Sequence, residues 1–139
     1  MPKRPSPSEK PRRQRLNRAR VVAAAVALAD QDGRDSLTMR NLALDLDVVP
    51  MAIYKHVSSK EELFSLMVDE VFAEIEMDAG LAWKDALRDR AISLRAALLR
   101  HPWAIGLTEA VSMGPSHLRD HESVLRCLRE DMGLSLIHI

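Results

Sequence analysis

Two short amphipathic segments separated by a tight break lie within residues 36–60, and this pattern restricts the possible folds more than any other feature of the chain. Thr38 is a residue type that caps helices, and Leu42 and Leu46 then recur at helical spacing on one face of a first helix. Asp47 tolerates the left-handed backbone conformation better than most residues, so a break is expected there. The first helix is therefore short and ends in a sharp turn.

A second short helix is expected from about Pro50 to His56, because proline suits a first helical position, where its missing N–H is not needed. Ile53 and Val57 point inward and meet the apolar face of the first helix. The outer face is then shared by Met51, Ala52, Tyr54, Lys55 and His56. Two helices in this arrangement form a helix-turn-helix, whose outer face is the surface that meets a DNA major groove.

Positive charge is concentrated before and within this motif, although the whole chain of 139 residues has a formal net charge of zero. Residues 1–60 hold 12 Lys and Arg against 6 Asp and Glu, a balance of +6, whereas residues 61–139 hold 8 against 14, a balance of −6. Cations that neutralise phosphates release counterions, which gives sequence-independent affinity for nucleic acid. A basic segment can also be a targeting signal or a solubilising end, but its position directly before a helix-turn-helix favours nucleic-acid binding.

The composition predicts an all-α fold. Aliphatic residues and alanine supply most of the 47% hydrophobic content, whereas aromatic residues make up only 4% and no alternation of β-branched residues is found. The single cysteine, Cys127, excludes an internal disulfide framework and fits a reducing, cytoplasmic setting. No apolar run approaches the roughly 20 residues that span a bilayer, so a membrane is not an expected partner.

Three parts are expected along the chain: a disordered, proline-rich basic arm at residues 1–11, a helix-turn-helix domain at residues 12–60, and a helical ligand-binding and dimerisation domain at residues 61–139. Around the motif, helices are predicted at residues 12–31, 58–78, 83–100, 103–112 and 115–132. Gly33 is expected to end the first of these helices, and Ser58 with Glu61 to form a capping box that opens the second.

Several short segments occur together in a specific combination: the alanine-rich first helix, then Leu37-Thr38-Met39-Arg40-Asn41-Leu42-Ala43, Ile53-Tyr54-Lys55-His56-Val57 and Lys60-Glu61-Glu62-Leu63. In this combination residues 14–72 resemble the tetracycline-repressor (TetR) family of bacterial transcriptional regulators. Residues 83–87 and 95–101 are similar, less specifically, to the ligand domains of the tetracycline repressors themselves. The resemblance implies a homodimer that binds a palindromic DNA operator and is released when a small-molecule effector enters the C-terminal domain.

The resemblance and the outward face of the second helix together give a candidate DNA-contacting set: Arg40, Pro50, Met51, Ala52, Tyr54, Lys55, His56 and Lys60. By resemblance, Arg40 stands where the family contacts a phosphate or base, and Lys60 matches a phosphate-anchoring lysine. Phenol, imidazole and ammonium groups are phosphate donors, whereas Met51 and Ala52 can offer only apolar contact, for instance to a thymine methyl. Asp47 stands where the family usually has glycine, which adds a negative charge near DNA.

The candidate effector site consists of Glu76, Trp83, Arg90, Leu94, Trp103, Thr108 and Met113. Glu76 and Arg90 stand where tetracycline repressors carry the His and Asn that hold the drug, and Thr108 replaces a His that helps to hold its metal. We therefore do not expect tetracycline. The acidic balance favours an apolar or cationic effector, while Arg90 and Arg95 are an opposing consideration because they could capture a carboxylate. Aromatic and Met positions at helical spacing equally suit an ordinary core.

The chain ends in Leu134-Ser135-Leu136-Ile137-His138-Ile139 without a cap or polar tail, which we interpret as a read-through or truncated-assembly ending rather than a natural stop. The family continues with the helices that build its dimer interface. On this interpretation residues 61–139 hold only part of the ligand domain, and the chain as written is expected to be poorly soluble or weakly dimeric.

Other classes of protein explain the sequence less completely. An enzyme is not expected, since the chain has no Gly-rich phosphate loop and no nucleophile with an ordered base, and no cofactor is predicted. His117 and His121 are spaced like metal ligands on one helix, but a polar helix face is the preferred interpretation and no metal site is predicted. A helical adaptor or nucleoid-type DNA-binding protein without effector control remains the alternative.

Overall fold

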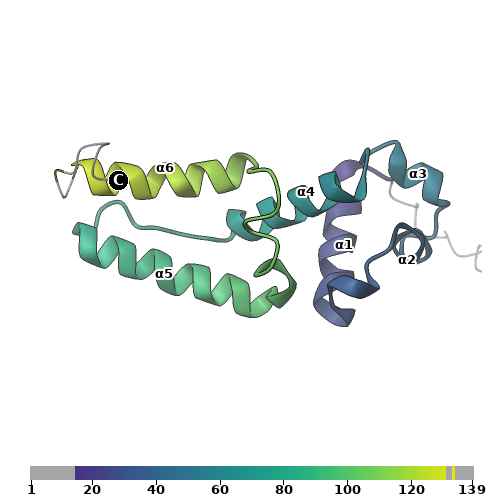
Figure 1. The fold of residues 1–139 in the computed structure, drawn as a ribbon, viewed down its shortest axis with the longest axis horizontal. Helices are drawn as coiled ribbons and strands as arrows, with labels where there is room; N and C mark the ends of the chain where they lie inside the picture. Colours follow the sequence, from purple (N-terminus) through teal and green to yellow (C-terminus); the bar gives the residue numbers. More distant parts are fainter. Residues whose placement is uncertain (1–14, 131–132, 134–139) are drawn as a thin grey trace, which may run out of the picture.

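The computed structural model describes residues 15–130 and Gly133, and every regular element within them is helical, as the composition predicts (Figure 1). The elements in chain order are α1 (Arg18–Asp32), the 3₁₀ turn η1 (Arg34–Ser36), α2 (Met39–Asp45), α3 (Pro50–Tyr54), α4 (Lys60–Ala73), α5 (Trp83–Arg100), the 3₁₀ turn η2 (Pro102–Ala104) and α6 (Pro115–Glu130). The expected disordered arm at residues 1–11 and the end of the chain from residue 134 lie outside the described residues.

Helix α1 begins later than the sequence pattern predicts. The prediction placed its start at Arg12, but residues 15–17 are not helical, and the side chain of Asn17 accepts a hydrogen bond from the Arg20 N–H at 2.8 Å. Asparagine is among the strongest N-cap residues because its side-chain oxygen satisfies an amide that has no helical partner. At the other end, Gly33 closes the helix with a φ of 82°, as predicted.

The helix-turn-helix forms where the sequence predicts it. Thr38 accepts a hydrogen bond from the Asn41 N–H at 3.0 Å and caps α2, and Asp47 adopts a φ of 53° at the break. The second helix is shorter than expected, because α3 ends at Tyr54 and the chain makes one further turn in which the His56 and Val57 N–H groups both bond to the Ile53 carbonyl.

Helix α4 differs from its predicted boundaries at both ends. The N-cap is Ser59, whose hydroxyl accepts a bond from the Glu62 N–H at 3.1 Å, so the predicted capping box at Ser58 and Glu61 is displaced by one residue. The helix ends at Ala73 rather than at the predicted Asp78. Acidic side chains are unfavourable at a helix C-terminus, and the run that follows Ala73 contains three of them, at Glu74, Glu76 and Asp78.

The α-helix predicted at residues 103–112 is wrong. The chain instead makes the turn η2 and then a series of further turns up to residue 110, with tight i to i+3 bonds such as Ala104 N–H to the His101 carbonyl at 3.0 Å. His101 is extended enough (φ −124°, ψ 65°) to end α5, and Trp103 and Leu107 then turn into the core. Burial of these two side chains outweighs the weak helical pattern of the segment.

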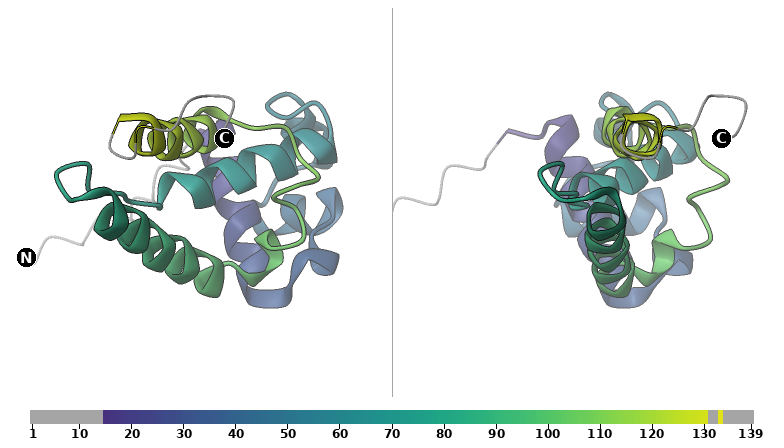
Figure 2. Two further views of the ribbon diagram at one scale, coloured as in Figure 1. Left: turned by 60° about the vertical axis from the view of Figure 1, so that its left-hand side comes forward. Right: turned by 90° about the vertical axis from the view of Figure 1, so that its left-hand side faces the viewer.

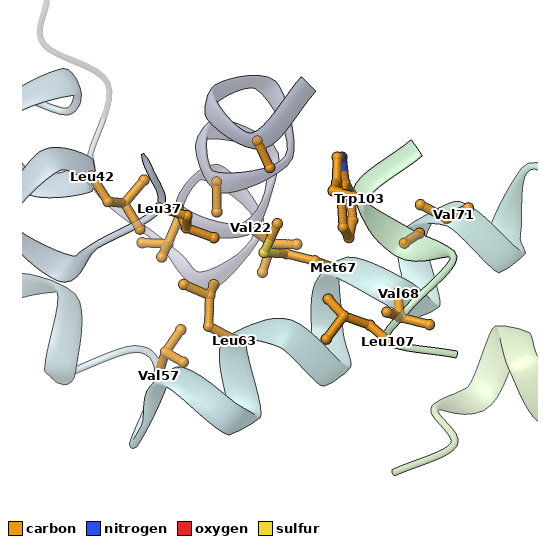
Figure 3. Close-up of a cluster of buried hydrophobic side chains, with 14 of the residues drawn as sticks. Val22, Leu37, Leu42, Val57, Leu63, Met67, Val68, Val71, Trp103 and Leu107 are labelled. Carbon is orange, nitrogen blue, oxygen red and sulfur yellow. The ribbon is translucent and has the colours of Figure 1, made fainter. Parts of the chain in front are cut away.

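One apolar core joins the helix-turn-helix to the rest of the molecule. Figure 3 shows its labelled side chains, which come from α1, α2, α4, the segments just before α2 and just before α4, and the segment after α5: Val22, Leu37, Leu42, Val57, Leu63, Met67, Val68, Val71, Trp103 and Leu107. Helix α4 leads from α3 toward α5 and α6, which lie alongside each other at the end of the molecule away from α2 and α3 (Figures 1 and 2). The division at residue 60 remains a prediction, since this core crosses it.

Within the described residues, no helix is both long and apolar enough to cross a membrane.

Candidate nucleic-acid interface

Helix α3 presents its outer face to solvent because two side chains hold its inner face in the core. Ile53 and Val57 are fully buried, as the spacing predicts, while Met51 is 71% exposed and Tyr54 is 46% exposed. Lys55 and Pro50 are exposed, and Ala52 and His56 are half-buried. The structure therefore brings six of the eight candidate DNA-contacting residues together on one short segment.

Two exposed cations flank this segment from neighbouring helices. Arg40 is the second residue of α2, and Lys60 is the first residue of α4, with its Nζ 5.5 Å from the centre of the Phe64 ring. Both side chains are exposed to solvent. Ammonium and guanidinium groups in such positions hold the phosphates on either side of a groove.

A polar network fixes the turn that follows α3. The Arg18 Nε of α1 donates to the His56 carbonyl at 3.1 Å, and the same guanidinium pairs with the Glu62 carboxylate. Glu62 also accepts bonds from the Ser58 hydroxyl at 2.5 Å and from the Ser58 N–H at 2.6 Å. Hydrogen bonds from Ser58, with the charge of Arg18, lower the pKa of Glu62 below its usual value of 4.5. Arg18 therefore has partners on both sides of Ser58 and helps to hold the turn after α3 in place.

The first turn of α3 is apolar. Val49, which precedes the helix, is 66% exposed, and together with Met51 it stands at the front of α3 without a polar neighbour on that turn. Leu44 of α2 is also 71% exposed and borders the same shallow hollow as Val49. Sequence reasoning missed Val49. Val48 was expected to point inward, and the outward position of the next residue could have been inferred from that.

The candidate effector residues do not converge on one cavity. Arg90 and Leu94 border an apolar groove along α5, whose other lining residues are Ala91, Arg95, Leu98, Leu99 and Ile105. Arg90 makes a two-bonded ion pair with Asp120 of α6 at 2.7 and 2.5 Å, and the Asp120 side chain is only 6% exposed. The guanidinium is therefore already matched by a carboxylate.

The other five candidate effector residues are not among those that line this groove, although Thr108 bonds to Ile105, which does line it. Trp103 is buried and donates from Nε1 to the Asp30 carboxylate at 2.6 Å, so it faces α1. The N–H of Glu76 bonds to the Ser93 hydroxyl, and Thr108 donates to the Ile105 carbonyl at 3.3 Å. Trp83 lies beneath the ammonium of Lys84, and Met113 is half exposed.

His101 joins three helices at the junction between the two parts of the chain. Its Nδ1 lies 2.8 Å from an Asp30 oxygen of α1, and its Nε2 lies 2.9 Å from a Glu74 oxygen at the end of α4. Burial alone would lower the pKa of His101, but its bonds to the two carboxylates outweigh burial and raise this pKa above 6.5. Arg100 donates to the other Glu74 oxygen, and bonds from Arg100 and His101 lower the pKa of Glu74 despite its partial burial.

His117, one of the two histidines on α6, packs against an aromatic ring of α4. The His117 ring stacks on Phe72 with the ring centres 3.8 Å apart, and burial lowers its pKa. Among the described residues, no three His, Cys, Asp or Glu side chains are placed to hold a metal ion. Cys127 is buried.

Comparison with known proteins gives two family matches. Residues 21–67 match the model of bacterial regulatory proteins of the tetR family, and residues 78–139 match the tetracyclin repressor-like C-terminal domain. The transcriptional repressor DrrR1 of Streptomyces coeruleorubidus is 38% identical over 137 residues, covering 96% of this chain and 49% of the relative. The class E tetracycline repressor protein of Escherichia coli is 31% identical over 126 residues, covering 88% and 59%. The chain thus spans about half the length of the curated relatives it matches.

Solved structures of regulators are similar over most of this chain. BioQ bound to its double-stranded DNA operator superimposes with a TM-score of 0.80 at 34% identity, covering 87% of this chain and 74% of that one. ActR of Streptomyces coelicolor in complex with actinorhodin gives a TM-score of 0.79 at 30% identity, covering 88% and 59%. The helical fold and the order of its parts are therefore shared with these proteins.

Proposed function

The chain belongs to the TetR family of bacterial regulatory proteins, and from this premise we propose that it is a DNA-binding transcriptional regulator, a repressor that a small-molecule effector releases from its operator. The observation that carries the proposal is the outer face of α3, where Met51, Tyr54 and Lys55 are exposed above the buried Ile53 and Val57. An enzymatic role is not proposed, because the relatives are regulators.

The proposed contacts divide by chemistry. Tyr54, Lys55 and His56 bind phosphates together with Arg40 and Lys60, because each of these side chains can donate a hydrogen bond to a phosphate oxygen. Pro50, Met51 and Ala52 face the bases. The similarity to BioQ, which was solved with its double-stranded DNA operator, supports DNA binding by this chain.

A palindromic operator and a homodimer complete the proposal. A single α3 has two turns of backbone at most and reads only a few base pairs, whereas two copies held about 34 to 36 Å apart read two half-sites in successive major grooves. Membership of the family supports this arrangement, since its members act as dimers.

The proposed effector is apolar or cationic rather than an anion or a metal-chelated drug. The charge of Arg90, which could otherwise capture a carboxylate, is matched by Asp120, and most of the other residues that line the groove are apolar, among them Ala91, Leu94 and Leu98. Arg95, which also lines the groove, is the opposing consideration. The similarity to ActR, which was solved in complex with actinorhodin, supports a small-molecule effector for this chain.

Substitution of the phosphate-binding side chains tests the proposal. A Tyr54→Ala, Lys60→Ala double variant is expected to lose affinity for all duplexes to a similar extent and to show a shallower salt dependence, because fewer counterions are released. The measurement is a gel shift at two salt concentrations with random and selected duplexes. Arg126→Ala is the matched control, since this exposed cation lies on α6 away from α3. Unchanged affinity of the double variant would contradict the proposal, and equal binding of random and selected duplexes would favour a nucleoid-type protein.

A further inference from the structure

The front of α3 has large exposed side chains but no hydrogen-bonding group with which to read a base. Val49 and Met51 are 66% and 71% exposed, and Pro50 between them has no N–H. Ala52, the next residue, is half-buried and equally apolar. Large apolar side chains that gather on the outside of a small domain mark a surface that meets a partner.

Charge around this apolar turn indicates which partner covers it. Lys55 follows on the same segment, and Arg40 and Lys60 flank it from α2 and α4, all three exposed. The exposed Asp47 lines the hollow beside Val49 and opposes these three cations, which outnumber it. An apolar patch with an excess of cations around it fits a polyanion that also presents apolar groups. In the major groove of duplex DNA, the only apolar group on a base edge is the C5-methyl of thymine.

We infer that Val49 and Met51 set the sequence preference of this chain by apolar contact with thymine C5-methyl groups in the major groove. The inference rests on the proposed function and goes beyond it, because it assigns Val49, which sequence reasoning left out, and makes apolar contact by Val49 and Met51 the determinant of sequence preference. Base pairs opposite the first turn of α3 are then distinguished by the presence of a methyl group and not by a hydrogen-bond pattern.

Replacement of thymine by deoxyuridine isolates this contact, since it removes the methyl group and leaves the Watson–Crick pair intact. A duplex is first selected from a random pool with the complete chain, and each thymine of the selected duplex is then replaced in turn. At one or more positions in each half-site, the affinity is expected to fall about fourfold, the factor that corresponds to burying one methyl-sized group. At a position that has been changed to cytosine, 5-methylcytosine is expected to bind more tightly than cytosine.

Protein variants assign the effect to the two side chains. A Val49→Ala, Met51→Ala double variant is expected to bind the thymine and deoxyuridine duplexes with equal affinity, whereas Met51→Leu retains the difference. Leu44→Ala is the matched control, because Leu44 is as exposed as Met51 but lies on α2, and it is expected to retain the difference as well. Circular dichroism of each variant checks that its helices are intact.

Each outcome has a defined meaning. Equal affinity of the unmodified chain for thymine and deoxyuridine at every position would overturn the inference while leaving DNA binding in place. The same holds if the double variant keeps the full difference or if Leu44→Ala abolishes it. A selection that enriches no sequence would overturn the proposed function, and the inference with it.

Discussion

Single side chains with partners far along the chain hold the two parts of this molecule together. Arg18 reaches Glu62 and the His56 carbonyl, and His101 lies between Asp30 and Glu74. The residues that these contacts join are 27 to 71 positions apart in the sequence. The positions of α3 relative to α1, and of α1 relative to α5, thus depend on a few polar groups at the edge of one apolar core.

The junction at His101 predicts a pH dependence of stability. Because the pKa of His101 is raised in the folded chain, its contribution is fully present below about pH 6.5 and is lost as the pH rises through the raised folded-state pKa. Thermal unfolding between pH 5.5 and pH 9 is expected to show a gap between the unmodified chain and a His101→Gln variant that narrows toward high pH. Glu74, whose pKa is lowered, stays ionised over this range. A gap of constant size would contradict this role of His101.

At the scale of elements, local patterns were predicted correctly and distant partners were not. Thr38 and Asp47 were recognised because a cap or a turn depends on neighbours three or four residues away. The true cap of α4 at Ser59 was missed by one residue, because two adjacent serines fit the same pattern and the choice depends on Glu62, which Arg18 of α1 also holds. The helix predicted after His101 failed for the same reason, since Trp103 bonds to Asp30, 73 residues away.

The contact between α4 and α6 predicts a second stability effect. The Asp69 carboxylate of α4 accepts bonds from the Ser116 and His117 N–H groups at 2.9 and 3.0 Å, and so caps α6 from outside. Asp69→Ala is expected to destabilise the chain by about 1 kcal/mol, the usual loss for a helix cap. A side chain at Gly114 would place its Cβ 2.3 Å from the Asp69 oxygen, so Gly114→Ala is expected to cost about 1 to 3 kcal/mol through crowding.

Denaturant unfolding of both single variants and the double variant forms a cycle that tests this packing. Because each substitution removes or displaces the same carboxylate, the double variant is expected to lose less stability than the sum of the two single losses. Strict additivity would mean that Asp69 and Gly114 do not meet in solution. Gly80→Ala serves as a control for glycine replacement outside helices, since its Cβ would meet only the Asp78 oxygen at 3.2 Å.

On the scale of the whole molecule, the chain is electrically divided between its two parts. Residues 1–60 carry a balance of +6 and residues 61–139 a balance of −6, so the DNA-facing part and the part with the α5 groove attract ligands of opposite charge. His101 at the end of α5 contacts Asp30 of α1, and Arg18 of the same helix contacts the turn after α3. Helix α1 is thus in contact with both parts of the chain. The family and the helix-turn-helix could be inferred from sequence, whereas the set of effector residues stays a prediction, because the sequence alone does not show which long-range pairs form around the α5 groove.

The ion pair beside the α5 groove predicts how effector preference responds to a single change. Asp120 matches the charge of Arg90, so cationic dyes are expected to bind the unmodified chain more tightly than fatty acids of similar size. Asp120→Asn leaves the guanidinium without a carboxylate partner, and fatty-acid binding measured by fluorescence displacement is then expected to rise several-fold while dye binding falls. Asp85→Asn is the matched control. It removes the same charge, but Asp85 forms an exposed ion pair with Arg88, and both residues lie on α5, the helix that also carries Arg90. Equal changes of fatty-acid and dye affinity in the two variants would show that the net charge of the chain alone affects ligand binding, and that the Arg90–Asp120 pair does not determine which ligand is preferred.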